Sequence, residues 1–181
     1  MEQNEQQIAI LMSTDMDKAM PLLFNTYSAY LYAVCCRYIS NDADASDVLQ
    51  DSFIHVFRNG SKYQWRGKGS LLSWLTKIVV NLALKHLEKE KKTQIVALDD
   101  SPDLENESPN LLHIPPEVLH ALIRKLPTGY RLVLNLYAFE GNSHKEIATQ
   151  LGITPQTSAS QLHHAKHLLK ELIIEYIEKN K

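Results

Sequence analysis

The sequence is poor in the features that build sheets. Only six of its 181 residues are glycine, β-branched runs are scarce, and no alternation of apolar and polar residues lasts beyond a few positions. A half-buried strand requires that alternation, whereas apolar residues here recur every three or four positions, as in helices. We therefore expect an all-α protein.

The sequence shows no long apolar run, and its first residues are not expected to be a signal peptide. No apolar stretch approaches the roughly 20 residues needed to span a membrane, and residues 1–5 are polar and acidic, unlike a signal peptide. The two cysteines, Cys35 and Cys36, are neighbours whose side chains diverge on a helix, so we expect neither a metal pair nor a routine disulfide. These absences favour a cytoplasmic protein with free thiols and no membrane insertion.

Positive charge is not in excess, and the negative charge is unevenly distributed. The formal net charge is -2; residues 93–114 contain five carboxylates and no Lys or Arg, whereas residues 1–92 and 115–181 are each slightly basic. The middle segment also has Pro102 and Pro109 and little periodicity, so it is expected to be a flexible linker. A chain this weakly basic should bind DNA poorly alone, since phosphate contacts supply most of the affinity.

Residues 143–169 carry the strongest local pattern, two helices joined by a tight turn. Ser143 and Glu146 have the spacing of a capping box, Gly152 supplies the turn, and Thr154 with Pro155 can start the second helix. The second helix is expected to be short and to be followed by a charged tail from 175 to 181. Its apolar stripe comprises Leu162, Ala165, Leu169, Leu172 and Tyr176. Its opposite face carries hydrogen-bonding groups, as in the base-reading helix of a helix-turn-helix: Gln156, Thr157, Ser160, His163, His164 and His167.

Five further helices are expected before the helix-turn-helix, over about 15–39, 42–58, 70–92, 116–125 and 130–140. Residues 1–13 are expected to be frayed or a short helix. The third of these helices is expected to start at Ser70 as its cap and to carry a second stripe of Trp74, Lys77, Asn81 and Lys85. The preceding loop places the aromatics Tyr63 and Trp65 beside basic groups. Together with this loop, the stripe suits single-stranded nucleic acid, which binds through stacking and phosphate contacts. The alternative is that both tryptophans belong to the core and that the lysines are simply solvated.

Three stretches together resemble the sigma-70 family, and within it the small extracytoplasmic-function (ECF) sigma factors of bacteria. Residues 45–53 (ASDVLQDSF) resemble the region-two helix that docks on the polymerase clamp, and residues 69–83 resemble the promoter-melting helix. Residues 126–131 (LPTGYR) with 146–165 resemble region four. The similarity covers roughly residues 22–175 in the family's order.

The resemblance implies two small helical domains, 1–92 and 115–181, joined by the acidic linker 93–114. It implies a bacterial factor that binds the beta and beta-prime subunits of core RNA polymerase, melts the -10 element with its first domain and reads the -35 element with its second. It also implies a candidate anti-sigma partner, a monomer and no cofactor. The expected polymerase contacts are Asp47, Gln50, Asp51 and Phe53. The expected -10 contacts are Tyr63, Trp65, Arg66, Lys68, Trp74, Lys77 and Asn81. The expected -35 contacts are Gln156, Thr157, Ser160, Gln161, His163, His164 and His167.

Two other functions compete with this interpretation. An enzyme would need a catalytic or metal constellation, and although His163 and His167 are four apart, only the weak candidate Glu171 is placed to extend that pair. We therefore expect no catalytic residues and no metal. A stand-alone helix-turn-helix regulator would usually dimerise, and a short C-terminal helix without a sustained heptad argues against that.

Overall fold

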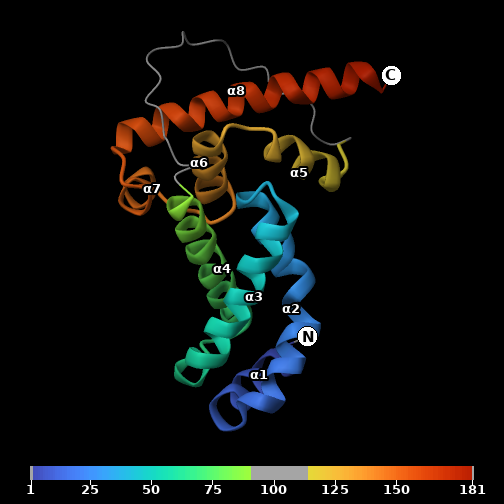
Figure 1. The fold of residues 1–181 in the computed structure, drawn as a ribbon, viewed down its shortest axis with the longest axis vertical. Helices are drawn as coiled ribbons and strands as arrows, with labels where there is room; N and C mark the ends of the chain where they lie inside the picture. Colours follow the sequence, from blue (N-terminus) through green and yellow to red (C-terminus); the bar gives the residue numbers. More distant parts are fainter. Residues whose placement is uncertain (1, 91–113, 181) are drawn as a thin grey trace. The chain divides into compact units, whose positions relative to one another are not determined.

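The computed structural model describes residues 2–90 and 114–180, and contacts divide the chain into two compact units, residues 1–90 and 91–181. All regular elements in the described ranges are helices, which confirms the all-α expectation (Figure 1). The expected linker falls outside the described residues except for Ile114. No helix within the described ranges is both long and apolar enough to cross a membrane.

The first unit is built on three long helices, α2 (Met16–Tyr38), α3 (Asp42–Asn59) and α4 (Ser70–Lys89). They pack against one another around a core that includes Leu23, Val48 and Leu75, while the shorter α1 (Glu2–Thr14) packs on α2 and on the 3-10 turn η1 (Gly60–Lys62) (Figure 1). The starts of α2 and α3 are fixed locally, because Asp15 accepts from the Lys18 amide and Asn41 from the Ala43 and Asp44 amides.

Helix α1 is the short helix that was one of the two expectations for residues 1–13, and its apolar side, including Ile8 and Met12, is buried. Two other expectations for this unit were wrong. Phe57 follows Phe53 by four residues, a spacing that predicts a place in the buried stripe of α3, but it is 48% exposed. Ser70 does not cap α4: Gly69 occupies the cap position, and the capping side chain belongs to Glu5 on α1.

The second unit comprises α5 (Pro116–Arg124), α6 (Thr128–Ala138), α7 (His144–Leu151) and α8 (Pro155–Lys179). Helix α8 packs against the other three, and its buried stripe continues through Leu162, Ala165 and Ile173. Arg131 is almost fully buried and closes the end of α5, because its Nη1 donates to the carbonyls of Arg124 and Leu126 at 3.0 and 3.3 Å.

The helix-turn-helix formed by α7 and α8 has the predicted local geometry. Ser143 and Glu146 form a complete capping box, Gly152 adopts φ 67°, and the Thr154 hydroxyl accepts from the Thr157 amide. The expectation of a short second helix with a separate tail was wrong, since α8 has 25 residues. Burial of Ile173 and the Glu175–Lys179 ion pair, one turn apart, favour its continuation.

Candidate nucleic-acid interface

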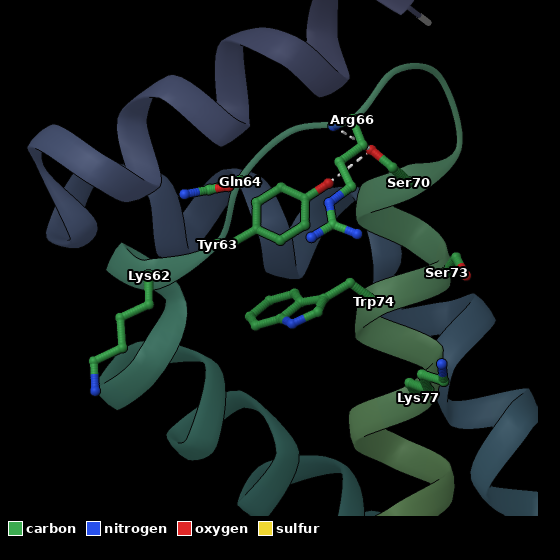
Figure 2. Close-up of a pocket in the computed structure, with 8 residues that line it drawn as sticks. All are labelled: Lys62, Tyr63, Gln64, Arg66, Ser70, Ser73, Trp74 and Lys77. Atoms are coloured by element: carbon green, nitrogen blue, oxygen red, sulfur yellow. Dashed lines mark hydrogen bonds between the residues drawn. The ribbon is translucent and has the colours of Figure 1, made fainter.

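An open hollow of about 400 Å³ lies between the loop that precedes α4 and the first turns of α4 (Figure 2). Three of its lining side chains are cationic, two are aromatic, and the rest are hydrogen-bonding groups. The lining residues are Lys62, Tyr63, Gln64, Arg66, Ser70, Ser73, Trp74 and Lys77. Aromatic rings beside cations are the combination that receives an unpaired base and its phosphates.

Ser70 holds the loop in shape. Its hydroxyl donates to the carbonyl of Gly67 at 2.6 Å and accepts from the backbone N–H of Arg66 at 3.2 Å. The phenol of Tyr63 lies 2.8 Å from the same oxygen. Because the single proton of Ser70 is used on Gly67, Tyr63 is the donor in this contact. The loop is thus closed on itself by one side chain (Figure 2).

The two aromatic rings of the hollow contact each other. The centroids of Tyr63 and Trp74 are 4.9 Å apart, within the range of contacting aromatic pairs, and their planes are tilted by 41°. Burial raises the pKa of the Tyr63 phenol, and the charge of Glu5 adds to this, while the Ser70 hydrogen bond and Arg66 oppose it. Tyr63 is therefore neutral near pH 7 and remains a hydrogen-bond donor.

The hollow collects four of the seven residues expected at the -10 element: Tyr63, Arg66, Trp74 and Lys77. Trp65, Lys68 and Asn81 are exposed but do not line it. The alternative that both tryptophans are core residues does not hold, since Trp65 is 37% exposed and Trp74 faces the hollow. Sequence reasoning missed Lys62, Gln64, Ser70 and Ser73. The spacing of Ser70, Ser73 and Lys77 places them on one face of α4 and could have revealed the two serines.

The face of α8 that is expected to read bases contains both exposed and packed residues. Gln156, His163 and His167 are exposed, and Thr157 and Ser160 are half-buried. His164 stacks on Tyr130 of α6, with centroids 5.7 Å apart and planes 19° apart. His167 Nδ1 lies 3.7 Å from a carboxylate oxygen of Glu171.

Gln161 lies on the other side of α8. Only 3% of it is exposed, and its Oε1 would be 2.9 Å from a Cβ added to Gly129, so the missing side chain of Gly129 makes room for it. In this conformation its amide is directed into the unit. We therefore omit Gln161 from the exposed face of α8.

Three of the four residues expected to contact polymerase follow one exposed face of α3. Asp47, Gln50 and Asp51 are exposed, whereas Phe53 is 7% exposed and packs against Phe24, with ring centroids 5.2 Å apart. Ile54 continues the exposed row and is 47% exposed. Sequence reasoning missed Ile54, although its spacing of three and four from Asp51 and Gln50 could have indicated it.

One group of side chains that could bind a metal lies close together, and it differs from the His163, His167 and Glu171 set considered from the sequence. Within the described ranges, ligand atoms of Asp44, His86 and Glu90 lie within 4.8 Å of one another. His86 Nε2 lies 3.7 Å from a Glu90 carboxylate oxygen, which accounts for the proximity as an ion pair when the imidazole is protonated. No further observation points to an ion, and we assign no metal.

Comparisons with known proteins agree on one family. The family model described as Sigma-70 region 2 matches residues 23–93, and the model described as Sigma-70, region 4 matches residues 117–169. The ECF RNA polymerase sigma factor SigE of Mycolicibacterium smegmatis is 28% identical over 93% of this chain and 68% of its own length. The RNA polymerase sigma-H factor of Pseudomonas aeruginosa is 25% identical over 95% of both chains. CnrH, solved in complex with the cytosolic domain of CnrY, has a similar fold, with a TM-score of 0.50 and 19% identity over 95% of this chain and 98% of its own.

Proposed function

The chain belongs to the sigma-70 family, in its extracytoplasmic-function group, and from this premise we propose that it binds core RNA polymerase and directs initiation at a specific set of promoters. Sigma factors are transcription initiation factors and not enzymes. The matched regions two and four fall in the two units, in the order that the family requires.

The observation that carries the proposal is the hollow lined by Tyr63 and Trp74. Unstacking a base costs a few kcal/mol, and stacking on an aromatic ring returns about 1–3 kcal/mol per base. Three cations, Lys62, Arg66 and Lys77, surround the rings and can hold the phosphates of the displaced strand. We assign this hollow to the melted -10 element.

The other contacts follow from the two exposed helix faces. The first half of α8, with Gln156 and His163 exposed, would enter the major groove of the -35 element. The acidic face of α3, with Asp47, Gln50 and Asp51, would dock on the polymerase, whose beta and beta-prime subunits are the expected partners. The protein would then act in the bacterial cytoplasm, and a partner protein that covers these faces would act as an anti-sigma factor.

In vitro transcription tests the proposal. The purified chain is mixed with sigma-free core polymerase and genomic promoter fragments, and a known sigma factor on the same core serves as the positive control. Specific initiation supports the proposal, and its absence while the control sigma works contradicts it. A gel-shift assay without polymerase separates the alternative of a stand-alone regulator, for which tight and specific duplex binding is expected. The length of α8 removes one objection to that alternative, but the near-neutral charge still opposes it.

A further inference from the structure

A single carboxylate joins α1 to the start of α4. Glu5 is only 7% exposed, and its two oxygens are both used: Oε2 accepts from the backbone N–H of Gly69 at 2.7 Å, and Oε1 from that of Leu71 at 2.8 Å. The first four N–H groups of a helix have no partner within the helix. Glu5 therefore does the work of a cap from more than 60 positions away in the sequence.

These two amides border the loop that forms the wall of the hollow. Gly67 and Gly69 adopt φ of 110° and 80°, in the left-handed region that glycine enters without strain, so this segment has many alternative conformations when it is not held. Ser70, which accepts from Tyr63 and closes the loop, lies between the two residues that Glu5 binds. Fixing Gly69 and Leu71 consequently fixes Ser70, and through it the ring of Tyr63.

The negative charge of Glu5 affects which groups can bind at the N-terminus of α4. A carboxylate at a helix N-terminus is stabilised by the helix dipole, and that position is otherwise ready to bind an anion. Because Glu5 already occupies it, a DNA phosphate has no place there. The phosphates of a bound strand must then use the side chains of Lys62, Arg66 and Lys77 on the other walls.

We propose that Glu5 is a positioning residue for base capture: by binding the amides of Gly69 and Leu71, it makes α1 a working part of the -10 interface. This inference rests on the proposed function. Helix α1 precedes the segment matched to region two, residues 23–93. The matched region alone therefore does not include the residue that binds these two amides.

Glu5→Gln tests the contact directly. Glutamine has the same size, but its NH2 group would face an N–H donor in place of one carboxylate oxygen, so one of the two hydrogen bonds is lost. We expect amide hydrogen exchange to accelerate by about tenfold or more at Gly69 or Leu71, whichever of the two loses its acceptor. Ile8→Val is the matched control, since Ile8 is buried on the same helix and its substitution weakens α1 packing but keeps the Glu5 carboxylate. Unchanged exchange at both amides in Glu5→Gln would overturn the contact.

The functional measurement uses holoenzyme reconstituted with each variant and a DNA pool whose unpaired segment is randomised. We expect Glu5→Gln to weaken binding of the sequences that wild type selects by about fivefold to tenfold, with unchanged affinity for core polymerase. Ile8→Val should bind as wild type does. Equal losses in the two variants, or wild-type binding by Glu5→Gln, would overturn the positioning role.

Two further outcomes keep the result interpretable. Thermal unfolding is measured first, and if Glu5→Gln does not fold, Glu5→Asp replaces it, with the same loss expected because its shorter side chain cannot reach both amides. Failure of the wild-type chain to select any unpaired sequence overturns the proposed function, and the positioning role with it. Loss of exchange protection without loss of binding overturns the positioning role alone.

Discussion

The ring of Tyr130 on α6 stacks on the imidazole of His164 on α8, with planes 19° apart, while the neighbouring His163 is exposed. Adjacent residues on one helix thus have different environments. His164 joins α8 to α6 through its ring contact with Tyr130, and His163 is available to a ligand. Their substitutions should separate in experiment.

We expect His163→Ala to weaken binding of holoenzyme to its -35 duplex without lowering the unfolding temperature. His164→Ala should instead cost about 0.5–1.5 kcal/mol of unfolding free energy, the contribution of an aromatic pair. Urea unfolding and binding to a selected promoter fragment measure the two effects. A stability loss in His163→Ala equal to that in His164→Ala would contradict the distinction.

Trp74→Ala should slow promoter opening and leave core binding intact. Loss of base stacking is worth about 1–3 kcal/mol, which corresponds to a slower rate of opening by roughly fivefold to 150-fold. Lys77→Ala should slow opening less and should reduce its salt dependence, because it removes a phosphate contact.

Opening is followed with a fluorescent base in the -10 segment, and core binding by competition with a known sigma factor. Lys89→Ala, exposed near the end of the same helix, is the control. Impaired core binding in Trp74→Ala would show that the ring is structural.

Arg131→Met should destabilise the second unit. The guanidinium donates to the carbonyls of Arg124 and Leu126, and methionine fills much of the space but cannot donate. We expect a loss of about 1–3 kcal/mol in urea unfolding, the penalty of leaving buried polar groups unsatisfied. Lys125→Met, at an exposed neighbouring position, should change stability by less than about 0.5 kcal/mol.

Cys35 should make the stability of the first unit fall in alkali. Burial, with a smaller contribution from Cys36, raises the pKa of the Cys35 thiol from 9.0 to about 12. Below pH 9 the thiol is protonated in both states, so its stabilisation is fully present. Between about pH 9 and 12 only the unfolded chain ionises, and stability should fall by up to about 1.4 kcal/mol per pH unit. Cys35→Ala should be less stable overall but should lack this part of the pH dependence in urea unfolding.

The features that could be predicted from the sequence were those between residues close together in the chain. The capping box of Ser143 and Glu146 and the Thr154 cap involve residues three apart, so the chain's own geometry determines them. The cap supplied by Glu5 joins residues 64 and 66 apart, and only the packing of α1 brings them together. The same distinction explains Gln161, a polar residue that a helical wheel places near the reading face but that Gly129 admits to the interior.

Composition misplaced one helix boundary, the end of α8. The charged residues after position 174 hid the contribution of Ile173, whose burial favours continuation of the helix. The hollow itself was only half predicted, since aromatic and basic residues stand out in a sequence whereas lining serines do not.

Helix α8 is continuous from Pro155 to Lys179, so the position of one end reports the orientation of the other. A straight helix of this length extends about 37 Å. Position 178 is exposed and lies at the end of α8 away from the proposed DNA-binding residues. A spin label there would report the tilt of the whole helix without entering the major groove. The orientation of α8 on DNA could then be followed in solution through the distance from label to duplex, with every proposed base contact left intact.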